Sequence, residues 1–493
     1  MDVADRTLSA KDFMSKEVSG RWTLASFVLD SIDDSPPRGH NVRARNPPGD
    51  PPMKSFICIV LTILSLWLTS LSLEAQSAAF RTTPPSLSCS PAPCVLPEVA
   101  TGGLLTSSFA VNPANPQQLM FGDGSGSSSA VEHSSDGGMT WTRTLLPILG
   151  IGGTNGLAYV GYDLNGKAYA TWADLSEPAG GSAIAFSSSS DNGSAWATAT
   201  LVVPSIDGSG EAADFLIVDN NPSSPFVNAI YIASDLVNGF GEVGIQVSYS
   251  QDGGATWNIA EVIPPITLTS ATYAKLATAK DGTVYVAWDS PQASSCSGVK
   301  IAVSKSTTGG RLWSSPANVT KVQQPPNCHL PNTNWVVSLY PTIAVDNSSG
   351  PFSGRLYVSS YNWTGTQMQV QVTSSSNGGA RWSAPVRVAS TGVNDEFNPW
   401  ISVSASGVLG VTWLDRRDDP ANLKYRAYAA VSTNGGKSFG NNVAIAGGLT
   451  DPSTGFPDTT LDLWNGTALF GVFPDAALTG ALQDVLGGVE LTH

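Results

Sequence analysis

A short motif, Ser-x-Asp-x-Gly-x-x-Trp, recurs along most of the chain, and this repetition constrains the fold more than any other feature. Three copies are strict. Three are looser, because Thr or Asn replaces Asp and Phe once replaces Trp. The copies are Ser134–Trp141, Ser189–Trp196, Ser250–Trp257, Ser306–Trp313, Ser375–Trp382 and Ser432–Phe439. Self-similarity at an interval of roughly 60 residues indicates a repeat architecture.

Each copy has the properties of a β-hairpin turn. The residues before it alternate between apolar and polar side chains, as in 244–249 (Gly-Ile-Gln-Val-Ser-Tyr), which is typical of a strand. Glycine adopts positive φ angles at little cost, so Asp-Gly-Gly suits a tight turn, and the Asp or Asn side chain can accept hydrogen bonds from the amides of that turn. The closing Trp begins the next strand and packs inward. We therefore expect a structural role for the motif.

The sequence between the motifs predicts two further strands in each unit, A and B, so that the motif becomes the turn between strands C and D. Seven A–B pairs can be found: 108–111 with 118–121, 157–160 with 168–172, 215–218 with 229–232, 275–277 with 284–288, 342–345 with 356–358, 400–403 with 410–413, and 460–463 with 468–472. The seventh pair lacks the motif and is followed by a third strand-like segment, 484–491. Four-stranded units at this interval predict an all-β fold, a β-propeller of seven blades, with six as the alternative if a terminal unit is partial.

Composition agrees with an extracellular protein rich in turns. Charged residues make up only 13% of the 493 residues, while there are 49 Gly and 33 Pro. The net charge is −14 and no basic block occurs, so we expect no nucleic-acid partner. The four His and the scattered Cys show no zinc-binding spacing.

The N-terminal part predicts export. Residues 1–52 are polar and become Pro-rich, which indicates a disordered or wrongly extended start. Residues 53–77 have the features of a signal peptide: Lys54, the apolar run Phe56–Leu73 and small residues at a cleavage site. The alternative is an uncleaved signal anchor, the only case in which we expect membrane attachment. Residues 78–98 form a Pro- and Cys-containing linker, and the propeller occupies 99–493, in a secreted or extracytoplasmic protein.

Export also bears on the cysteines. Cys58 leaves with the signal peptide, and four remain, an even number that suggests disulfides in an exported chain. Cys89 and Cys94 lie close together in the linker, which leaves Cys296 and Cys328 to pair with each other.

The recurring motif resembles the Asp-box, or bacterial neuraminidase repeat, and the array resembles the sialidase-like propeller superfamily. The segment 413–422 (Trp-Leu-Asp-Arg-Arg-Asp-Asp-Pro-Ala-Asn) is similar to one in secreted bacterial exo-alpha-sialidase-like proteins. The resemblance implies glycoside hydrolysis at the face formed by the B–C loops and the links between blades. It also implies three substrate-binding arginines, a Tyr nucleophile helped by Glu, and an Asp acid/base. The resemblance supports the fold more strongly than the activity, because one fold can host many functions.

The arginines depart from that pattern. No Arg-Ile-Pro motif occurs in the first unit, and Phe80-Arg81-Thr82-Thr83-Pro84 resembles it only distantly. By topology, Arg416 and Arg417 belong to the B–C loop face, whereas the other arginines fall in turns of the opposite face or in strands. Two adjacent guanidinium groups do not make a three-arginine site.

The sixth unit is the richest in candidate site residues. Glu396 and Asp415 are the expected acid/base pair, with Arg416 beside them and Tyr340 as the nucleophile that the resemblance requires. The residues expected to bind substrate on the same face are Arg417, Trp335, Trp400, Glu211 and Tyr273. The alternative is a surface ion-pair cluster that orders two loops.

Strand B ends in an acidic or amide residue in every unit. The carboxylates concerned, besides Asp415, are Asp123, Asp174, Asp235, Asp289 and Asp475. Each could cap its own loop, or several could converge on a cation such as Ca²⁺, which prefers oxygen ligands. We expect no required cofactor.

Two functions remain open from the sequence. The first is an exported sialidase-like propeller that binds a glycan, with or without hydrolysing it. The second is a non-catalytic scaffold for an extracellular protein.

Overall fold

The computed structural model describes most of the repeat region. The described residues are 22–28, 94–95, 99–101, 106–125, 128–138, 140–149, 155–174, 183–203, 211–237, 243–264, 271–290, 298–333, 337, 339, 341–390, 392–444, 449 and 470–471. Within this part of the chain no helix has the length and apolar character needed to cross a bilayer. The segment Phe56–Leu73 lies outside it.

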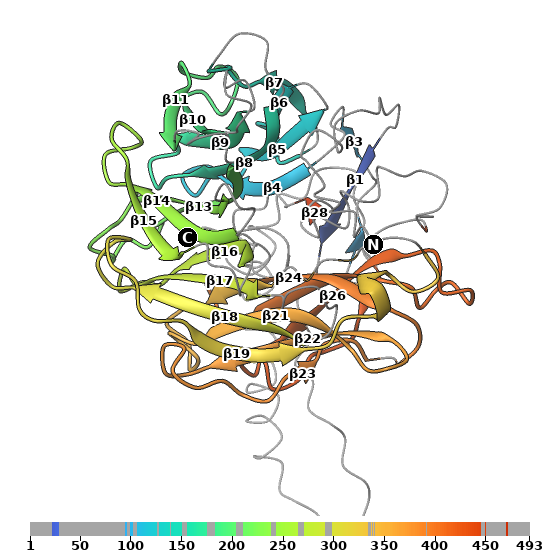
Figure 1. The fold of residues 1–493 in the computed structure, drawn as a ribbon. Coiled ribbons are helices and arrows are strands. Elements are labelled where there is room, and N and C mark those ends of the chain that lie inside the picture. Colours follow the sequence, from blue (N-terminus) through green and yellow to red (C-terminus); the bar gives the residue numbers. More distant parts are fainter. Residues whose placement is uncertain are drawn as a thin grey trace, which may run out of the picture. The chain divides into compact units, whose positions relative to one another are not determined.

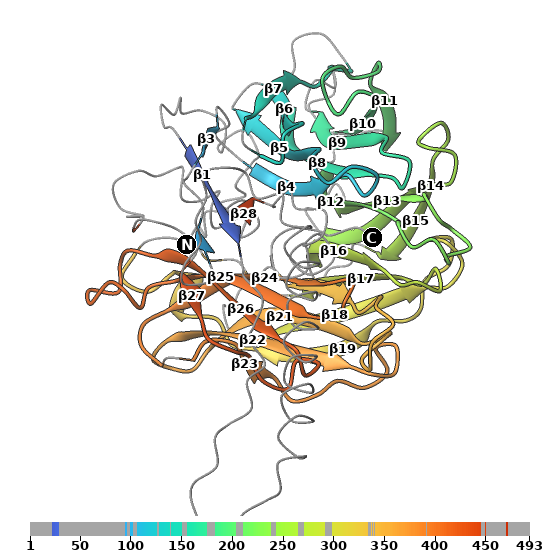
Figure 2. The same cartoon turned by 180° about the vertical axis from the view of Figure 1, so that it is seen from behind.

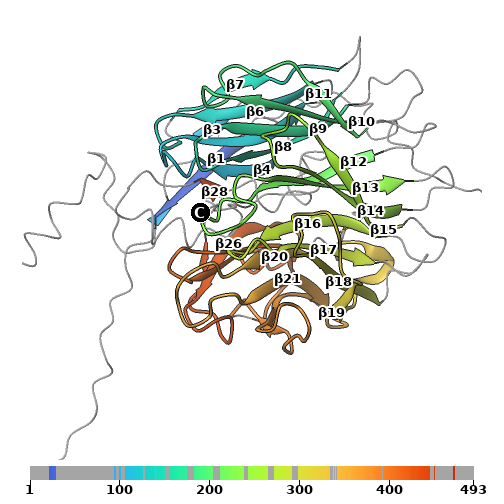
Figure 3. The ribbon, with the colours of Figure 1, turned by 90° about the vertical axis from the view of Figure 1, so that its left-hand side faces the viewer.

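In the described part of the chain, six antiparallel sheets of four strands follow one another, and each is one blade of a propeller (Figure 1). Their strands, in the order A to D, are β4 (Thr106–Val111), β5 (Leu119–Ser125), β6 (Ser128–Ser134) and β7 (Thr142–Leu145); β8 (Asn155–Tyr162), β9 (Ala168–Asp174), β10 (Ala183–Ser189) and β11 (Thr200–Val203); β12 (Glu211–Val218), β13 (Ile230–Val237), β14 (Val243–Ser250) and β15 (Asn258–Ile263); β16 (Thr272–Thr278), β17 (Val284–Ser290), β18 (Val299–Ser306) and β19 (Ala317–Val322); β20 (Thr342–Val345), β21 (Leu356–Trp363), β22 (Met368–Ser375) and β23 (Val386–Arg387); and β24 (Glu396–Val403), β25 (Leu409–Asp415), β26 (Arg426–Ser432) and β27 (Val443–Ala444). Strands A of consecutive blades contact one another, and Figures 2 and 3 show the same succession from behind and from the side.

The prediction of seven blades is wrong, and the six-blade alternative describes the structure. Of the seventh predicted A–B pair, only β28 (Phe470–Gly471) lies within the described residues. It pairs in parallel with β1 (Trp22–Val28), so it is not strand B of a further antiparallel repeat. The remaining strands of this small sheet are β2 (Cys94–Val95) and β3 (Val99–Thr101).

Strand B of the second, fourth and sixth blades carries a buried tryptophan. Trp172, Trp288 and Trp413 are at most 1% exposed. Trp172 lies opposite Ala158 on one side and opposite Ala185 on the other. Small residues therefore flank this ring in the second blade, whereas in the sixth blade Trp413 lies opposite Tyr428 and stacks on it, with ring centroids 6.1 Å apart.

The turn between strands C and D has the same hydrogen bonds in all six blades. In the first blade, Ser134 Oγ accepts a hydrogen bond from the Gly138 amide at 2.8 Å, and Asp136 Oδ1 accepts one from the Thr140 amide at 2.9 Å. In the fourth blade, Thr308 Oγ1 takes the place of the carboxylate and accepts from the Leu312 amide at 2.9 Å. The turn is therefore held by side-chain oxygens at two positions, and it does not require a negative charge.

These turns also contact the preceding blade. A Cβ atom added to the second turn glycine would meet a side chain of that neighbour: Gly193 meets His133, Gly254 meets Phe186, Gly310 meets Tyr249, and Gly436 meets Tyr357. In the fifth blade the contact is a hydrogen bond of 3.1 Å from Lys305 Nζ to the carbonyl of Gly378. The glycines thus serve both the positive φ of the turn and the close approach of two blades.

Candidate functional site

The predicted acid/base residues of the sixth blade are neighbours in the sheet. Glu396 begins strand β24 and lies directly opposite Asp415, the last residue of strand β25. Both are completely buried. The structure therefore brings the two carboxylates together and surrounds them with protein atoms.

Glu396 joins the sixth blade to the fifth. Its Oε1 lies 2.5 Å from Nη2 of Arg387 on β23, and its Oε2 accepts a hydrogen bond of 3.0 Å from the amide of Val370 on β22. Burial raises the pKa of Glu396 from 4.5 to about 7, against the opposing effects of the Val370 amide and the Arg387 guanidinium. A carboxyl in this condition can hold a proton near neutral pH.

Asp415 is saturated by donors from its own strand and the next two residues. Its Oδ2 accepts from Arg417 Nη2 at 2.5 Å and from Trp413 Nε1 at 2.7 Å, and its Oδ1 accepts from the Arg417 amide at 2.8 Å. The Arg417 guanidinium lies 4.3 Å from the ring centroid of Tyr428 and donates to Asn442 Oδ1 at 3.1 Å. The Arg417 side chain thus interacts with other residues of the protein.

Arg416 points into the protein. It is completely buried, and its Nη1 lies 3.5 Å from Oδ2 of Asp395 and 2.7 Å from the carbonyl oxygen of Pro331. Its guanidinium lies 5.6 Å from the ring centroid of Phe397. Burial lowers the pKa of Arg416 to about 10, and Asp395 opposes this shift. The two adjacent arginines therefore face different partners and do not form a clamp on the loop face.

Of the other residues expected at the site, Trp400 and Tyr273 have described side chains. Trp400 is 8% exposed and packs on Phe215, with ring centroids 5.8 Å apart. Tyr273 is half-buried in β16, at a register shift of the strand, and has a φ of 59°. The side chains of Trp335, Tyr340 and Glu211 lie outside the described residues.

The carboxylates predicted to bind a cation do not gather in the described part of the chain. Asp174 is completely buried and accepts a hydrogen bond of 2.9 Å from the amide of Leu149, which belongs to the link between the first and second blades and not to the B–C loop that follows Asp174. Asp289 is buried and Asp235 is half-buried, while the side chain of Asp123 and the whole of Asp475 lie outside the described residues. Among the residues described, no group of three or more His, Cys, Asp or Glu could hold a metal ion.

The expected disulfides can be located only in part. Cys328 ends the short 3-10 helix η2 (Pro326–Cys328), in the link between the fourth and fifth blades, and Cys94 belongs to β2. Cys89 and Cys296 lie outside the described residues.

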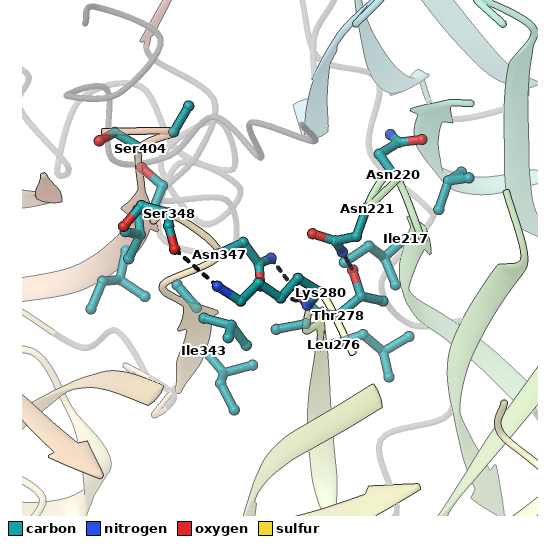
Figure 4. Close-up of a pocket in the computed structure, with 18 of the residues that line it drawn as sticks. Ile217, Asn220, Asn221, Leu276, Thr278, Lys280, Ile343, Asn347, Ser348 and Ser404 are labelled. Carbon is teal, nitrogen blue, oxygen red and sulfur yellow. Dashed lines mark hydrogen bonds between the residues drawn. The ribbon is translucent and has the colours of Figure 1, made fainter. Parts of the chain in front are cut away.

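A cavity of about 480 Å³ opens among strands A of the third to sixth blades. Its walls come from β12, β16, β20 and β24, and the A–B turns add further polar residues (Figure 4). The polar set includes Asn220, Asn221, Lys280, Asn347 and Ser348. This face is opposite the B–C loops, where the sequence led us to expect the site.

A repeated tripeptide marks this second location in the sequence. The tripeptide Val-Asp-Asn ends strand A of both the third and the fifth blade, at 218–220 and 345–347. In both copies the Asp accepts a backbone amide two residues on, at 3.1 Å in Asp219 and 3.0 Å in Asp346. The Asn side chains then bond to the neighbouring blade, Asn220 to the Tyr162 carbonyl and Asn347 to the Thr278 carbonyl, both at 2.8 Å.

Comparisons with known proteins concern the fold. No protein-family model matches the sequence, and no curated protein matches it either. Solved structures with a similar arrangement include a Hadza microbial sialidase (14% identity, TM-score 0.44, 63% of each chain covered) and the NanB sialidase of Streptococcus pneumoniae (12%, 0.43, 63% of this chain and 65% of that one). The intramolecular trans-sialidase of Ruminococcus gnavus is similar over 65% of this chain and 92% of its own, at 12% identity and a TM-score of 0.45.

The chain thus spans less than two thirds of the length of the first two sialidases. At such identities these matches are silent on activity.

Proposed function

We propose that this chain is an exported, sialidase-like propeller that binds a glycan without hydrolysing it. The observation that supports this most is the state of the two expected catalytic carboxylates. Glu396 and Asp415 are completely buried, and the hydrogen bonds that their oxygens accept come from protein donors. A general acid or base must come within hydrogen-bond reach of the proton it transfers, and a carboxyl group that protein atoms enclose is out of reach of a bound substrate.

One observation favours hydrolysis as a second candidate function. The raised pKa of Glu396, about 7, is the property that a general acid needs at neutral pH. For Glu396 to act, the ion pair with Arg387 and the Val370 contact would have to open. The resemblance that suggested Tyr340 as nucleophile belongs to this second candidate.

A screen of the purified exported chain separates the two. It would use fluorogenic α- and β-glycosides, including a sialoside, with and without a chelator, beside a glycan array. We expect binding on the array and no turnover. Turnover that Glu396→Gln abolishes while the protein remains folded would establish the hydrolase instead. If no glycan binds and nothing is turned over, the remaining interpretation is the scaffold for an extracellular protein.

Export is the second part of the proposal. We infer that residues 53–77 are removed as a signal peptide, so that the mature chain begins near residue 78 and lies outside the cytoplasm. N-terminal sequencing of the protein from its native host tests this, since an intact residue 1 or a retained Phe56–Leu73 segment would contradict it.

The cysteines and the repeat turns complete the proposal. We infer disulfides between Cys296 and Cys328 and between Cys89 and Cys94, which peptide mapping under non-reducing conditions would detect. The six repeat turns are proposed to be Asp-boxes on the basis of their shared hydrogen bonds. Calcium bound by the strand B carboxylates stays a proposal, and a melting temperature unaffected by chelation would count against it.

A further inference from the structure

His133 lies at the contact between the first and the second blade. It is the last residue but one of strand β6 and comes directly before Ser134, which opens the first repeat turn. Its side chain is 8% exposed. A Cβ atom added to Gly193, in the repeat turn of the second blade, would lie 3.4 Å from Cβ and 3.7 Å from Cδ2 of His133. The imidazole therefore forms part of the surface of β6 that this turn contacts.

The residue before the motif serine has the same role in two other blades. In the third blade it is Tyr249, whose Cγ would lie 3.0 Å from a Cβ atom added to Gly310 in the turn of the fourth blade. In the fourth blade it is Lys305, whose Nζ donates to the carbonyl of Gly378 in the turn of the fifth blade. Of these three side-chain types, histidine is the one that ordinarily changes its charge between about pH 5 and 8. The first junction thus carries a group that acid can alter.

The packing around His133 suits a neutral imidazole. Its Nε2 is buried and has no hydrogen-bond partner among the residues that the structure describes. An imidazolium carries a proton on both nitrogens, so Nε2 would become a buried donor without an acceptor, which is unfavourable. Burial accordingly lowers the pKa of His133 from its ordinary value of 6.5, and Asp191 opposes this shift.

Asp191 acts on His133 from the repeat turn of the second blade. Its side chain is exposed, and its Oδ1 accepts hydrogen bonds from Ser189 Oγ at 2.6 Å and from the Ala195 amide at 3.0 Å. These bonds lower the pKa of Asp191, so the carboxylate keeps its charge while the imidazole takes up a proton. Water screens an exposed carboxylate, and burial of the imidazole therefore outweighs its attraction.

The neighbours of His133 within its own sheet add no carboxylate on the same face. His133 lies opposite Met120 on β5 and opposite Thr142 on β7, and neither side chain titrates. Glu132 and Arg143 lie opposite each other one residue away. Because successive side chains of a strand point to opposite faces of the sheet, this charged pair faces away from the imidazole.

Asn192 fastens the second-blade turn to the first blade through neutral hydrogen bonds. Its Nδ2 donates to the carbonyl of Ser134 at 2.8 Å and to Ser135 Oγ at 3.0 Å, and its Oδ1 accepts from the hydroxyl of Tyr162 on β8. Burial raises the pKa of Tyr162, so this phenol stays neutral. In the described part of the junction, His133 is thus the group whose charge acid can change.

We propose that His133 makes the contact between the first two blades sensitive to acid. Once the imidazole takes up a second proton, it leaves its buried place for water, and the turn Ser189–Trp196 separates from β6. The opened chain binds this proton more readily than the closed one, so the closed junction is lost as the pH falls below the ordinary histidine value of 6.5. The proposal concerns a junction separate from the sixth-blade cluster and holds whether or not the protein binds a glycan.

Hydrogen exchange of the full exported chain, followed by mass spectrometry of its peptides, tests this. After correction for the intrinsic pH dependence of exchange, we expect residues 187–197 to open at least about threefold more often at about pH 5 than at about pH 7. Residues 304–314, the turn of the fourth blade, should show no such change, because the residue that it contacts on the third blade is a tyrosine.

Three variants assign the effect to the imidazole. His133→Gln keeps a polar side chain and removes the titration, so the acid response of residues 187–197 should disappear. His133→Tyr places the residue of the third blade in the first and should have the same result, which keeps the test open if the glutamine variant does not fold. His329→Gln changes the half-buried histidine that follows η2 and should leave the response as in the wild type.

The proposal is overturned if residues 187–197 and 304–314 respond to acid alike, because the effect is then not local to the first junction. It is also overturned if the His133 variants keep the wild-type response, or if His329→Gln removes it. Loss of protection in all six blades together would identify global acid unfolding instead. Glu396 cannot imitate the expected result, since its contribution to stability falls as the pH rises.

Discussion

The turn glycine Gly254 offers a direct measure of how closely two blades approach. It has a φ of +88°, and a Cβ atom there would overlap Cε1 of Phe186 and lie 2.6 Å from its Cζ. The Phe186 ring cannot easily withdraw, because it is 2% exposed and packs edge-on against Trp257 at 4.9 Å and on Tyr169 at 5.7 Å. Gly254→Ala therefore combines backbone strain with overpacking.

The two costs can be separated with a matched variant. Gly354 has a φ of +78°, and a Cβ atom added there would have no other atom within 4 Å, so Gly354→Ala carries the backbone strain alone. We expect about 1–2 kcal/mol for that strain. Displacing a packed ring adds about 1–3 kcal/mol. Gly254→Ala should thus lower the free energy of unfolding by roughly 2–5 kcal/mol.

Urea unfolding followed by tryptophan fluorescence measures both variants. Coincident transitions by fluorescence and circular dichroism are needed first, because a repeat protein of this size can depart from two-state behaviour. If Gly254→Ala costs no more than Gly354→Ala, the turn does not press on Phe186, and the reasoning about blade contact is refuted.

Three further predictions concern the sixth-blade cluster and the repeat turns. Because burial raises the pKa of Glu396 from 4.5 to about 7, the folded protein binds a proton that the unfolded chain releases in this interval, and stability should fall as the pH rises through it. The free energy of unfolding should fall by about 3 kcal/mol at most. In urea titrations at several pH values, Glu396→Gln should depend less on pH than the wild type. Parallel plots of unfolding free energy against pH for the two proteins would contradict this. Arg416→Met should cost about 3–5 kcal/mol in thermal unfolding by leaving Asp395 as an unpaired buried charge, and a loss below about 1 kcal/mol would show that Asp395 is satisfied by its other donors. Ser375→Ala removes the acceptor of the Gly379 amide and should cost about 1–3 kcal/mol, whereas Ser376→Ala, at an exposed position, should be neutral; equal effects would argue against the turn network.

The repeat pattern predicted the blades because it is local. A strand, a turn of fixed length and a closing aromatic lie within a few residues of one another, so hairpins such as β6–β7 follow directly from the sequence. The number of blades is not local. The segment 468–472 resembles a strand B, but its described residues pair in parallel with β1, and alternation alone cannot identify a partner strand so distant in sequence.

In the candidate site, too, the local features could be predicted from the sequence and the non-local ones could not. Topology placed Glu396 beside Asp415, and the sheet register agrees. The direction of Arg416 could not be predicted, because its partners Asp395 and the Pro331 carbonyl come from two different links between blades. The cavity was missed for a related reason: its four walls are strands that the sequence separates by whole repeats, and only the doubled Val-Asp-Asn hinted at them.

The contact between each repeat turn and the blade before it bears on how such a chain can change in length over evolution. From the second blade to the fifth, every unit carries a turn that contacts its predecessor and strands that contact the turn of its successor. A duplicated unit would therefore contain both the turn that contacts the preceding blade and the strands that contact the turn of the following blade. Gaining or losing one unit would leave the other junctions intact, since repeats of this kind interact mainly with their nearest neighbours.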